Sequence, residues 1–248
     1  MNRLQNKVAV ITGGNSGIGF ATAQEFIAQG ARVVITGRNA AAVQEAVAQL
    51  GSQAVGIVSD AASMADLRQL AGQMQAHHAR IDVLFVNAGV SYSAPIAQVD
   101  EAHFDTQFNI NVKGAYFTIQ QLLPLVNDGG SIILNSSATV HQAFPDISVY
   151  VATKAAIASF ARTFSVELLP RRIRVNAISP GPVATPIYDK MIPAEFREQA
   201  AAGFTEAVPM KRFGRPQEIA TIATFLASDD SSFVIGEEII AGGGVGTL

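Results

Sequence analysis

Short runs of β-branched residues alternate along the chain with alanine-rich segments in which apolar residues recur at helical spacing. The runs predict about seven strands, at residues 7–11, 32–36, 54–58, 83–86, 131–134, 173–178 and 238–240. The segments between them predict helices at 18–29, 40–50, 63–79, 103–123, 148–168 and 216–227. Gly30 and Gly51 close the first two helices. Ser63 and Asp66 match an N-cap followed by an acid at the third helical position.

The predicted strands are almost entirely apolar, which is typical of strands that are covered on both faces. Alternation of strand and helix implies right-handed crossovers and a parallel sheet. The pattern therefore predicts an α/β fold over residues 1–248, a single-domain, doubly wound sheet of the Rossmann type. Ligands of such sheets bind outside the carboxyl ends of the strands, where the strand order reverses. The proline-rich segment 180–209 is expected to form a mobile substrate flap at about 183–210, and not to join the sheet.

Composition narrows the function classes. The chain has 49% hydrophobic and 15% charged residues, which argues against disorder. The net charge of -3 offers no basic surface to nucleic acid or anionic lipid. There is no cysteine, so disulfides and thiolate chemistry are excluded. Because the N-terminus lacks the apolar region of a signal peptide and no apolar run approaches the ~18 residues of a membrane span, we expect a soluble cytoplasmic protein.

The first predicted strand is followed by a glycine-rich turn, "TGGNSGIG", at residues 12–19. Its glycines permit a tight turn and a close approach of the backbone to a pyrophosphate. The helix that follows presents free N–H groups and the positive end of its dipole to such a group. The spacing G-x-x-x-G-x-G differs from the commoner G-x-G-x-x-G, so an ordinary glycine-rich connection is the alternative.

The end of the second predicted strand is expected to face the ribose of a bound adenosine. An acid at this point would accept a hydrogen bond from the 2′-hydroxyl of NAD, but the sequence has Arg38 and Asn39. A guanidinium suits a 2′-phosphate, and no carboxylate is present to repel it. The pattern favours NADP over NAD, with a solvated loop arginine as the alternative.

Tyr150 and Lys154 stand four residues apart in a predicted helix that is otherwise small and apolar. This spacing puts the phenol and the ammonium on one helix face. An ammonium stabilises a phenolate, so the pair can act as a general acid or base near neutral pH. Ser137, just past the fifth predicted strand, can hydrogen-bond a substrate carbonyl oxygen. A structural polar pair and a serine turn at a strand end are the alternatives.

Five motifs together resemble the short-chain dehydrogenases/reductases, over essentially the whole chain. They are "TGGNSGIG", "VNAG" at 86–89, "NSS" at 135–137, "YVATK" at 150–154 and "SPGPVAT" at 179–185. Within that family, the sequence is most similar to bacterial NADP-dependent alcohol dehydrogenases and ketoreductases.

The resemblance implies a role for each catalytic residue. Tyr150 donates its proton to the carbonyl oxygen during reduction and takes it back during oxidation. Lys154 lowers the pKa of Tyr150 and holds the hydroxyls of the nicotinamide ribose. Ser137 orients the carbonyl and stabilises developing oxyanion charge. Asn111 matches the asparagine that anchors a water in a proton relay to Lys154; an asparagine bonded to nearby backbone is the alternative for this residue.

The resemblance also implies a cofactor site. The residues expected to form it are Gly13, Asn15, Ser16, Gly17, Ile18, Gly19, Arg38, Asn39, Asp60, Ala61, Asn87, Ala88, Gly89, Tyr150, Lys154, Pro180, Gly181, Val183 and Thr185. Among them, Asp60 matches the acid near the adenine amino group. Two positions depart from the family pattern. Ser16 stands where many NADP-preferring members carry a basic residue, and Ala241 stands where many members have an aspartate before the final glycine pair.

The substrate wall is expected at 90–96, 138–146 and 183–210. These segments contain the apolar or aromatic side chains Tyr92, Phe144, Ile187, Tyr188, Met191 and Phe204, which favour an apolar or aromatic ketone. His141 either lines this pocket or is a plain loop histidine. His77 and His78 have too few companion ligands for a metal, so no metal site is expected. The small or apolar faces of the helices at 103–123 and 148–168 match the family's subunit interfaces and favour a homotetramer.

Three functions are compatible with these residues. The leading one is reversible reduction of a ketone or aldehyde by NADPH. The second is reduction of a 3-oxoacyl-[acyl-carrier-protein], or oxidation of a sugar, at the same site; an acyl-carrier partner would require a basic rim that the charge balance does not indicate. The third is a cofactor-binding sensor or scaffold without chemistry, against which the intact set of Ser137, Tyr150 and Lys154 argues.

Overall fold

The computed structural model describes residues 2–186 and 197–248. Its centre is one seven-stranded parallel sheet in the order β3-β2-β1-β4-β5-β6-β7. The strands are β1 (Val8–Thr12), β2 (Arg32–Gly37), β3 (Ala54–Val58), β4 (Ile81–Val86), β5 (Val126–Asn135), β6 (Arg174–Pro180) and β7 (Glu238–Ala241). The strand order reverses between β1 and β4, where Val10 pairs with Val34 on one side and Leu84 on the other. The predicted doubly wound α/β fold is confirmed.

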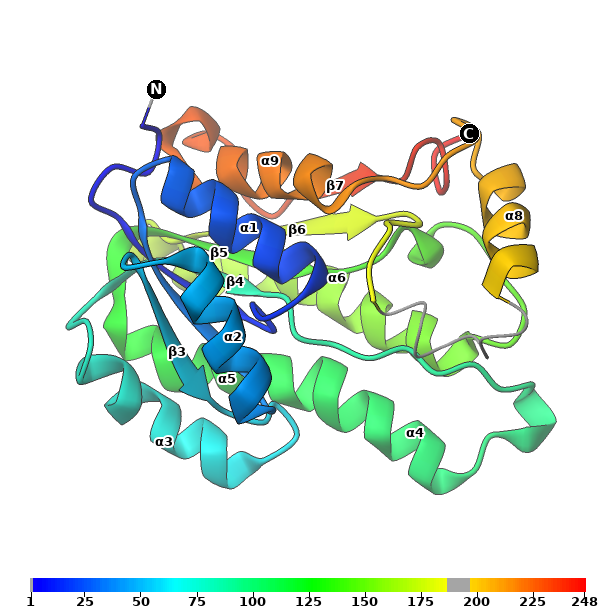
Figure 1. Ribbon diagram of the computed structural model, residues 1–248, viewed down its shortest axis with the longest axis horizontal. Helices are drawn as coiled ribbons and strands as arrows, with labels where there is room; N and C mark the ends of the chain where they lie inside the picture. The colour runs from blue at the N-terminus through cyan, green and yellow to red at the C-terminus, as the bar shows by residue number, and fades with distance from the viewer. Residues whose placement is uncertain (1, 187–196) are drawn as a thin grey trace.

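Helices cover both faces of the sheet (Figure 1). They are α1 (Gly17–Ala28), α2 (Ala40–Leu50), α3 (Met64–Gln75), α4 (Glu101–Phe108), α5 (Ala115–Leu122), α6 (Ser148–Leu168), α8 (Arg197–Ala207) and α9 (Pro216–Ala227). Single 3-10 turns lie at Ile96–Gln98, Leu123–Leu125, Ala138–Val140, Leu169–Arg171 and Asp229–Ser231. A π-helical segment, Asn109–Gly114, joins α4 to α5.

Two hydrophobic cores lie on opposite faces of the sheet because successive strand residues point to opposite sides. On one face, Val10 and Leu84 pack with side chains of α3, α5 and α6. On the other face, Ile11 and Phe85 pack with side chains of α1, α2 and α9. Helices α1 and α9 lie side by side (Figure 1). This double cover explains why the strands are apolar on both sides and leaves their carboxyl ends free for a ligand.

Strand β5 begins five residues before the strand predicted at 131–134, and three helical segments differ from the prediction. The helix expected at 63–79 ends at Gln75, because Met74 is its last buried residue. The helix expected at 103–123 is interrupted by the π-helical segment. The segment 180–209 contains α8, which was not predicted because the prolines around it obscured its alanine-rich sequence. The mobility of the flap stays a prediction.

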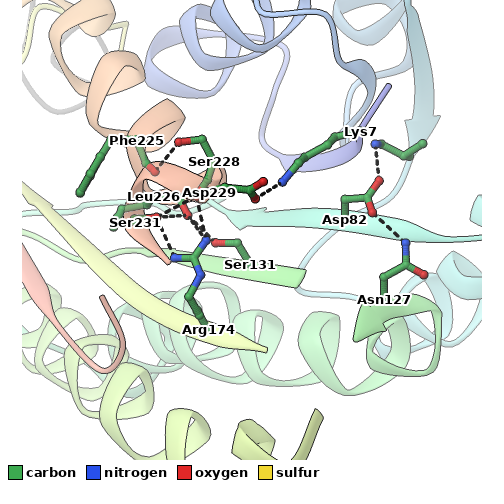
Figure 2. A network of polar contacts seen from close by, with 11 residues as sticks. Lys7, Asp82, Asn127, Ser131, Arg174, Phe225, Leu226, Ser228, Asp229 and Ser231 are labelled. Carbon is green, nitrogen blue, oxygen red and sulfur yellow. Dashed lines mark hydrogen bonds and ion pairs between the residues drawn. The ribbon is translucent and has the colours of Figure 1, made fainter. Parts of the chain in front are cut away.

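A polar network stabilises the amino ends of the strands, opposite the carboxyl ends (Figure 2). The Arg174 guanidinium donates to the Leu226 and Ser228 carbonyl oxygens, at 2.9 and 3.1 Å, and to the Ser231 hydroxyl at 2.8 Å. Burial lowers the pKa of Arg174, and Asp229 opposes that shift. Because Leu226 and Ser228 lie at the end of α9, the cation satisfies carbonyls that the helix leaves unpaired. Within the described ranges, no helix is long and apolar enough to cross a membrane.

Candidate functional site

A cleft of about 990 Å³ opens at the carboxyl ends of the strands. Its wall includes all of the predicted catalytic and cofactor residues except Gly19 and Asn111. These two are buried behind the wall, where Gly19 packs on the first turn and Asn111 holds the segment after β4. The residues that the sequence scatters between positions 13 and 185 therefore converge on one site.

The turn after β1 has the shape of a phosphate cradle. Gly13 and Gly17 have φ angles of 63° and 54°, which L side chains rarely adopt. A Cβ on Gly19 would lie 2.4 Å from the Gly13 carbonyl oxygen, so only glycine allows α1 to begin this close to the turn. Ser16, the N-cap of α1, is exposed, makes no side-chain capping bond, and is followed by a first turn without acids. The free N–H groups of α1 thus face the cleft unopposed, and the turn fits a pyrophosphate.

The cleft wall continues past the ends of β2 and β3. Arg38 is exposed there and forms no hydrogen bond or ion pair with residues 2–186 or 197–248. The Asn39 side chain accepts a hydrogen bond from the Ala42 N–H at 3.0 Å and caps α2. The Asp60 carboxylate accepts one from the Ala62 N–H at 2.9 Å and stabilises its own turn. Of these side chains, Arg38 is the one left entirely available to a ligand.

A chain of amide hydrogen bonds links the first turn to Lys154. The Thr12 hydroxyl accepts from the Asn87 N–H at 2.9 Å, and the Asn87 side chain donates to the Thr12 carbonyl at 3.0 Å. Asn135 donates through Nδ2 to Asn87 Oδ1 at 2.9 Å, and its carbonyl accepts from Lys154 Nζ at 2.6 Å. Sequence reasoning missed Asn135 as a site residue, although an amide at the end of an apolar strand was a signal for it.

Tyr150 and Lys154 lie on the same face of α6, as their spacing predicted, with Nζ 5.8 Å from the centroid of the phenol ring. Burial lowers the pKa of Lys154 to about 8. Burial also raises the pKa of Tyr150, and the hydrogen bond with the Ser137 hydroxyl opposes that rise. Loss of water around the phenol thus outweighs the effect of its hydrogen bond with Ser137. That Lys154 lowers the pKa of Tyr150, as the family resemblance implies, stays a prediction.

Ser137 faces Tyr150 from the turn after β5. Its oxygen accepts a hydrogen bond from the Thr139 hydroxyl at 2.9 Å and one from the Thr139 N–H at 3.3 Å. These bonds occupy the lone pairs of Ser137 and leave its own proton to be donated. The Ser137 hydroxyl is thus oriented as a donor, and Thr139, which sequence reasoning did not single out, sets that orientation.

Asn111 lies in the π-helical segment and ties it to the segment after β4. Its Oδ1 accepts from the Val90 N–H at 2.8 Å, and its Nδ2 donates to the Val90 carbonyl at 2.8 Å and to the Thr153 hydroxyl at 3.0 Å. Gln107, buried one turn earlier, accepts from the Tyr92 N–H at 3.1 Å. The side chain of Asn111 is therefore bonded mainly to backbone, which was the alternative weighed for it, and its part in a water relay stays a prediction.

The loop after β6 meets the C-terminal segment. The Gly181 N–H donates to the Ala241 carbonyl at 3.1 Å, and a Cβ on Gly181 would lie 2.7 Å from the Gly242 Cα. Thr185 packs against Gly17, so this loop reaches the first turn. Ala241 thus holds the start of this loop through its carbonyl, although it does not itself line the cleft.

The part of the cleft beyond Ser137 and Tyr150, here called the substrate half, is lined by three of the aromatic residues predicted for the substrate wall: Tyr92, Phe144 and Phe204. Ile187, Tyr188 and Met191 lie outside the described residues. The wall also includes Asp146 and Val208, which lie in the predicted segments but were not singled out, and Val245, which lies outside those segments and was missed. His141 is not part of the wall, because its Nε2 pairs with Glu238 Oε1 at 2.9 Å, so it anchors the loop to β7.

Comparison with known proteins extends over the whole chain. The family model described as enoyl-(acyl carrier protein) reductase matches residues 13–246. Oxidoreductase asL5 of Sarocladium schorii is 39% identical over 250 residues, covering 100% of this chain and 99% of that protein. The 3-oxoacyl-[acyl-carrier-protein] reductase FabG of Thermotoga maritima is 34% identical, covering 98% and 99%. The crystal structure of levodione reductase matches with a TM-score of 0.93 at 28% identity, covering 99% of this chain and 100% of that one.

Proposed function

Because this chain belongs to the short-chain dehydrogenases/reductases, oxidoreductases that act on carbonyl and alcohol groups, we propose that it transfers a hydride between NADP(H) and a ketone, an aldehyde or a secondary alcohol. The observation that carries the proposal is the meeting of Ser137, Tyr150 and Lys154 at the wall of one cleft. The glycine turn at the other end of this cleft fits the pyrophosphate of the dinucleotide. When bound, the nicotinamide supplies or accepts the hydride.

Tyr150 is the proton donor in the reducing direction. Burial raises the pKa of its phenol, so the group keeps its proton at neutral pH and has it available for the carbonyl oxygen. Ser137 donates a second hydrogen bond to that oxygen, since Thr139 occupies its lone pairs. The Lys154 ammonium stabilises the negative charge that develops on the phenol oxygen as the proton leaves, and it also holds the ribose hydroxyls.

NADP is the proposed cofactor, and NAD is the less favoured one. Arg38 at the end of β2 is exposed and unpaired among the described residues, and the two residues on either side of it include no carboxylate. A guanidinium in this setting binds a 2′-phosphate through charge-assisted hydrogen bonds. Asp60 and Ala61 line the cleft near the expected position of the adenine ring.

The proposed substrate is a small carbonyl compound or alcohol, probed first with apolar and aromatic ketones. The aromatic rings of Tyr92, Phe144 and Phe204 in the substrate half support this class. Acyl-carrier and sugar substrates remain the alternatives. They are suggested by the similarity to FabG of Thermotoga maritima and to the glucose and ribitol dehydrogenase of Daucus carota, which is 34% identical. We also propose a cytoplasmic homotetramer, because Phe104, Tyr116 and Val166 expose apolar surface on the helices that were expected to form interfaces.

The central test replaces Tyr150 by phenylalanine. The variant should lose turnover by about 10²- to 10⁴-fold, because the proton donor is gone, while it keeps its affinity for NADPH. Turnover is followed at 340 nm against a set of ketones and secondary alcohols, and affinity by the fluorescence of bound NADPH. Tyr116→Phe, which alters an exposed tyrosine on α5 outside the cleft wall, is the matched control. Undiminished turnover in the Tyr150 variant, or no turnover of any compound by the native protein, refutes the proposal and favours a cofactor-binding sensor.

A second test addresses the cofactor. Arg38→Ala should weaken NADPH binding by about 10- to 100-fold, the value of one or two hydrogen bonds to a charged group, and leave NADH binding unchanged. Both dissociation constants are measured by nucleotide fluorescence at one ionic strength, since salt screens an exposed charge. An equal change for both nucleotides would contradict the assignment of Arg38 to a 2′-phosphate.

A further inference from the structure

The charged side chains of the cleft wall are unevenly placed. Four of the described residues in this wall carry a charge. Arg38 and Asp60 follow β2 and β3, at the end assigned to the adenosine, and Lys154 lies beside Tyr150. The fourth, Asp146, lies among the residues of the substrate half. Within the part of the chain that the structure describes, a substrate therefore meets one charged side chain beyond the catalytic group, and it is negative.

The backbone at Asp146 is held in place from two sides. Its φ angle of 63° lies in the left-handed region, which aspartate tolerates better than most residues. Its carbonyl accepts a hydrogen bond from the Ala94 N–H at 2.8 Å, which joins the loop before α6 to the opposite wall after β4. Four residues later, the same loop has become α6 and presents Tyr150. The backbone that carries the Asp146 side chain is therefore fixed to both walls of the substrate half.

The Asp146 carboxylate has no hydrogen bond or ion pair with residues 2–186 or 197–248, and its side chain is exposed. Apart from Ser137 and Tyr150, the hydroxyls of Ser91, Ser93 and Thr139 are the other polar groups among the described residues of this half, and its remaining described residues are mainly apolar or aromatic. Other described acids near helix starts are bonded within the protein: Asp66 accepts a hydrogen bond from the Ser63 hydroxyl, and Asp100 accepts one from the His103 N–H. Asp146 differs because its acceptor oxygens remain available to a molecule in the cleft.

We propose that Asp146 determines specificity by accepting a hydrogen bond from a donor group on the substrate, an ammonium or a hydroxyl, on the side away from the carbonyl. This inference rests on the proposed function, since it names the class of carbonyl compound that the cleft takes. A substrate with a carboxylate at that position is disfavoured by repulsion between like charges. The enzyme then selects neutral or cationic carbonyl compounds with an apolar body and a distal donor.

The test uses three acetophenones that differ only at the 4′ position: aminomethyl, hydroxymethyl and carboxylate. Binding is measured by calorimetry in the presence of NADP, and turnover is measured separately with NADPH. The native protein should bind the aminomethyl compound about tenfold more tightly than the carboxylate compound, the size expected of a partly exposed charge pair that is attractive in one case and repulsive in the other. Asp146→Asn should reduce this ratio to about twofold or less.

Asp100→Asn is the matched control, because it removes an exposed acid at the start of α4, outside the cleft wall. A native protein without the preference, or an Asp146→Asn variant that keeps it, overturns the inference. The same holds if Asp146→Asn lowers only thermal stability, as Asp100→Asn would, because Asp146 is then a residue of the helix terminus alone. If the binding ratio and its loss are observed while none of the three ketones is reduced, the role of Asp146 stands and the proposed function fails.

Discussion

Replacement of Lys154 by methionine tests the electrostatics of the site through protein stability. Burial lowers the pKa of this ammonium from 10.5 to about 8 in the folded protein. Below pH 8 both states hold the proton, and the folded protein carries the full cost of a buried charge. Between pH 8 and 10.5 the folded protein has released the proton and the unfolded chain has not, so stability rises with pH. The shift corresponds to about 3 kcal/mol at 1.36 kcal/mol per pH unit.

The prediction is a difference between two stability curves. Relative to Lys154→Met, the native protein should gain about 2.5 kcal/mol of unfolding free energy between pH 7 and pH 10. At pH 7 the variant is free of the buried charge, but it also loses the 2.6 Å hydrogen bond to the Asn135 carbonyl. An unsatisfied buried carbonyl costs about 1–3 kcal/mol, so the stability of the variant at pH 7 should be close to native or moderately higher. Its turnover should be abolished.

Urea unfolding followed by circular dichroism at 222 nm is the appropriate assay, because the chain has no tryptophan. Measurements at pH 7, 8, 9 and 10 are made without nucleotide at one protein concentration, since association alters apparent stability. Lys113→Met, which removes an exposed lysine, measures the effect of losing one positive charge from the whole protein. A stability difference between Lys154→Met and the native protein that stays flat from pH 7 to 10 would refute the reasoning, because the ammonium would then be hydrated in the folded state.

Two further substitutions test the frame of the site. Gly19→Ala should destabilise the protein by about 1–3 kcal/mol and weaken nucleotide binding, because the new methyl group would lie 2.4 Å from the Gly13 carbonyl oxygen. The control is Gly72→Ala, whose methyl group would meet nothing within 4 Å. Both variants are compared by urea unfolding and by fluorescence titration with the nucleotide. Arg174→Met should cost about 2 kcal/mol of stability and leave kcat unchanged, because it unpairs carbonyls at the amino ends of the strands, away from the cleft; a fall in kcat at full folding would contradict this separation.

Local chemistry determines which parts of this architecture the sequence predicts. The bounds of α2, α6 and α9 were predicted correctly, because their starts and ends are set by neighbouring residues such as the Asn39 cap and Gly51. The common face of Tyr150 and Lys154 follows from helix geometry alone. Much of the candidate site was likewise predicted, because its motifs sit directly after strands whose ends share one edge of the sheet.

The remaining features depend on contacts between distant parts of the chain. A side chain at Gly19 is excluded partly by Asn87, which follows a different strand, β4. The direction of the pKa shift of Tyr150 depends on burial, which no motif encodes. Asp146 joins the cleft through a left-handed backbone and a bond to Ala94, neither of which leaves a periodic signal. The bonds that commit Asn111 to Val90 likewise appear only once the chain is folded.

The π-helical segment Asn109–Gly114 connects α4 to α5 and also determines how the side chains before and after its start are oriented relative to each other. Gln107 and Asn111 stand on either side of its start and each fastens one residue of the same extended segment, Tyr92 and Val90. Removal of one residue at Asn109 would restore ordinary helical winding and swing Gln107 by about 100° relative to Asn111, so the two amides could no longer face one segment together. This segment should therefore tolerate substitutions of its exposed residues better than it tolerates insertions or deletions.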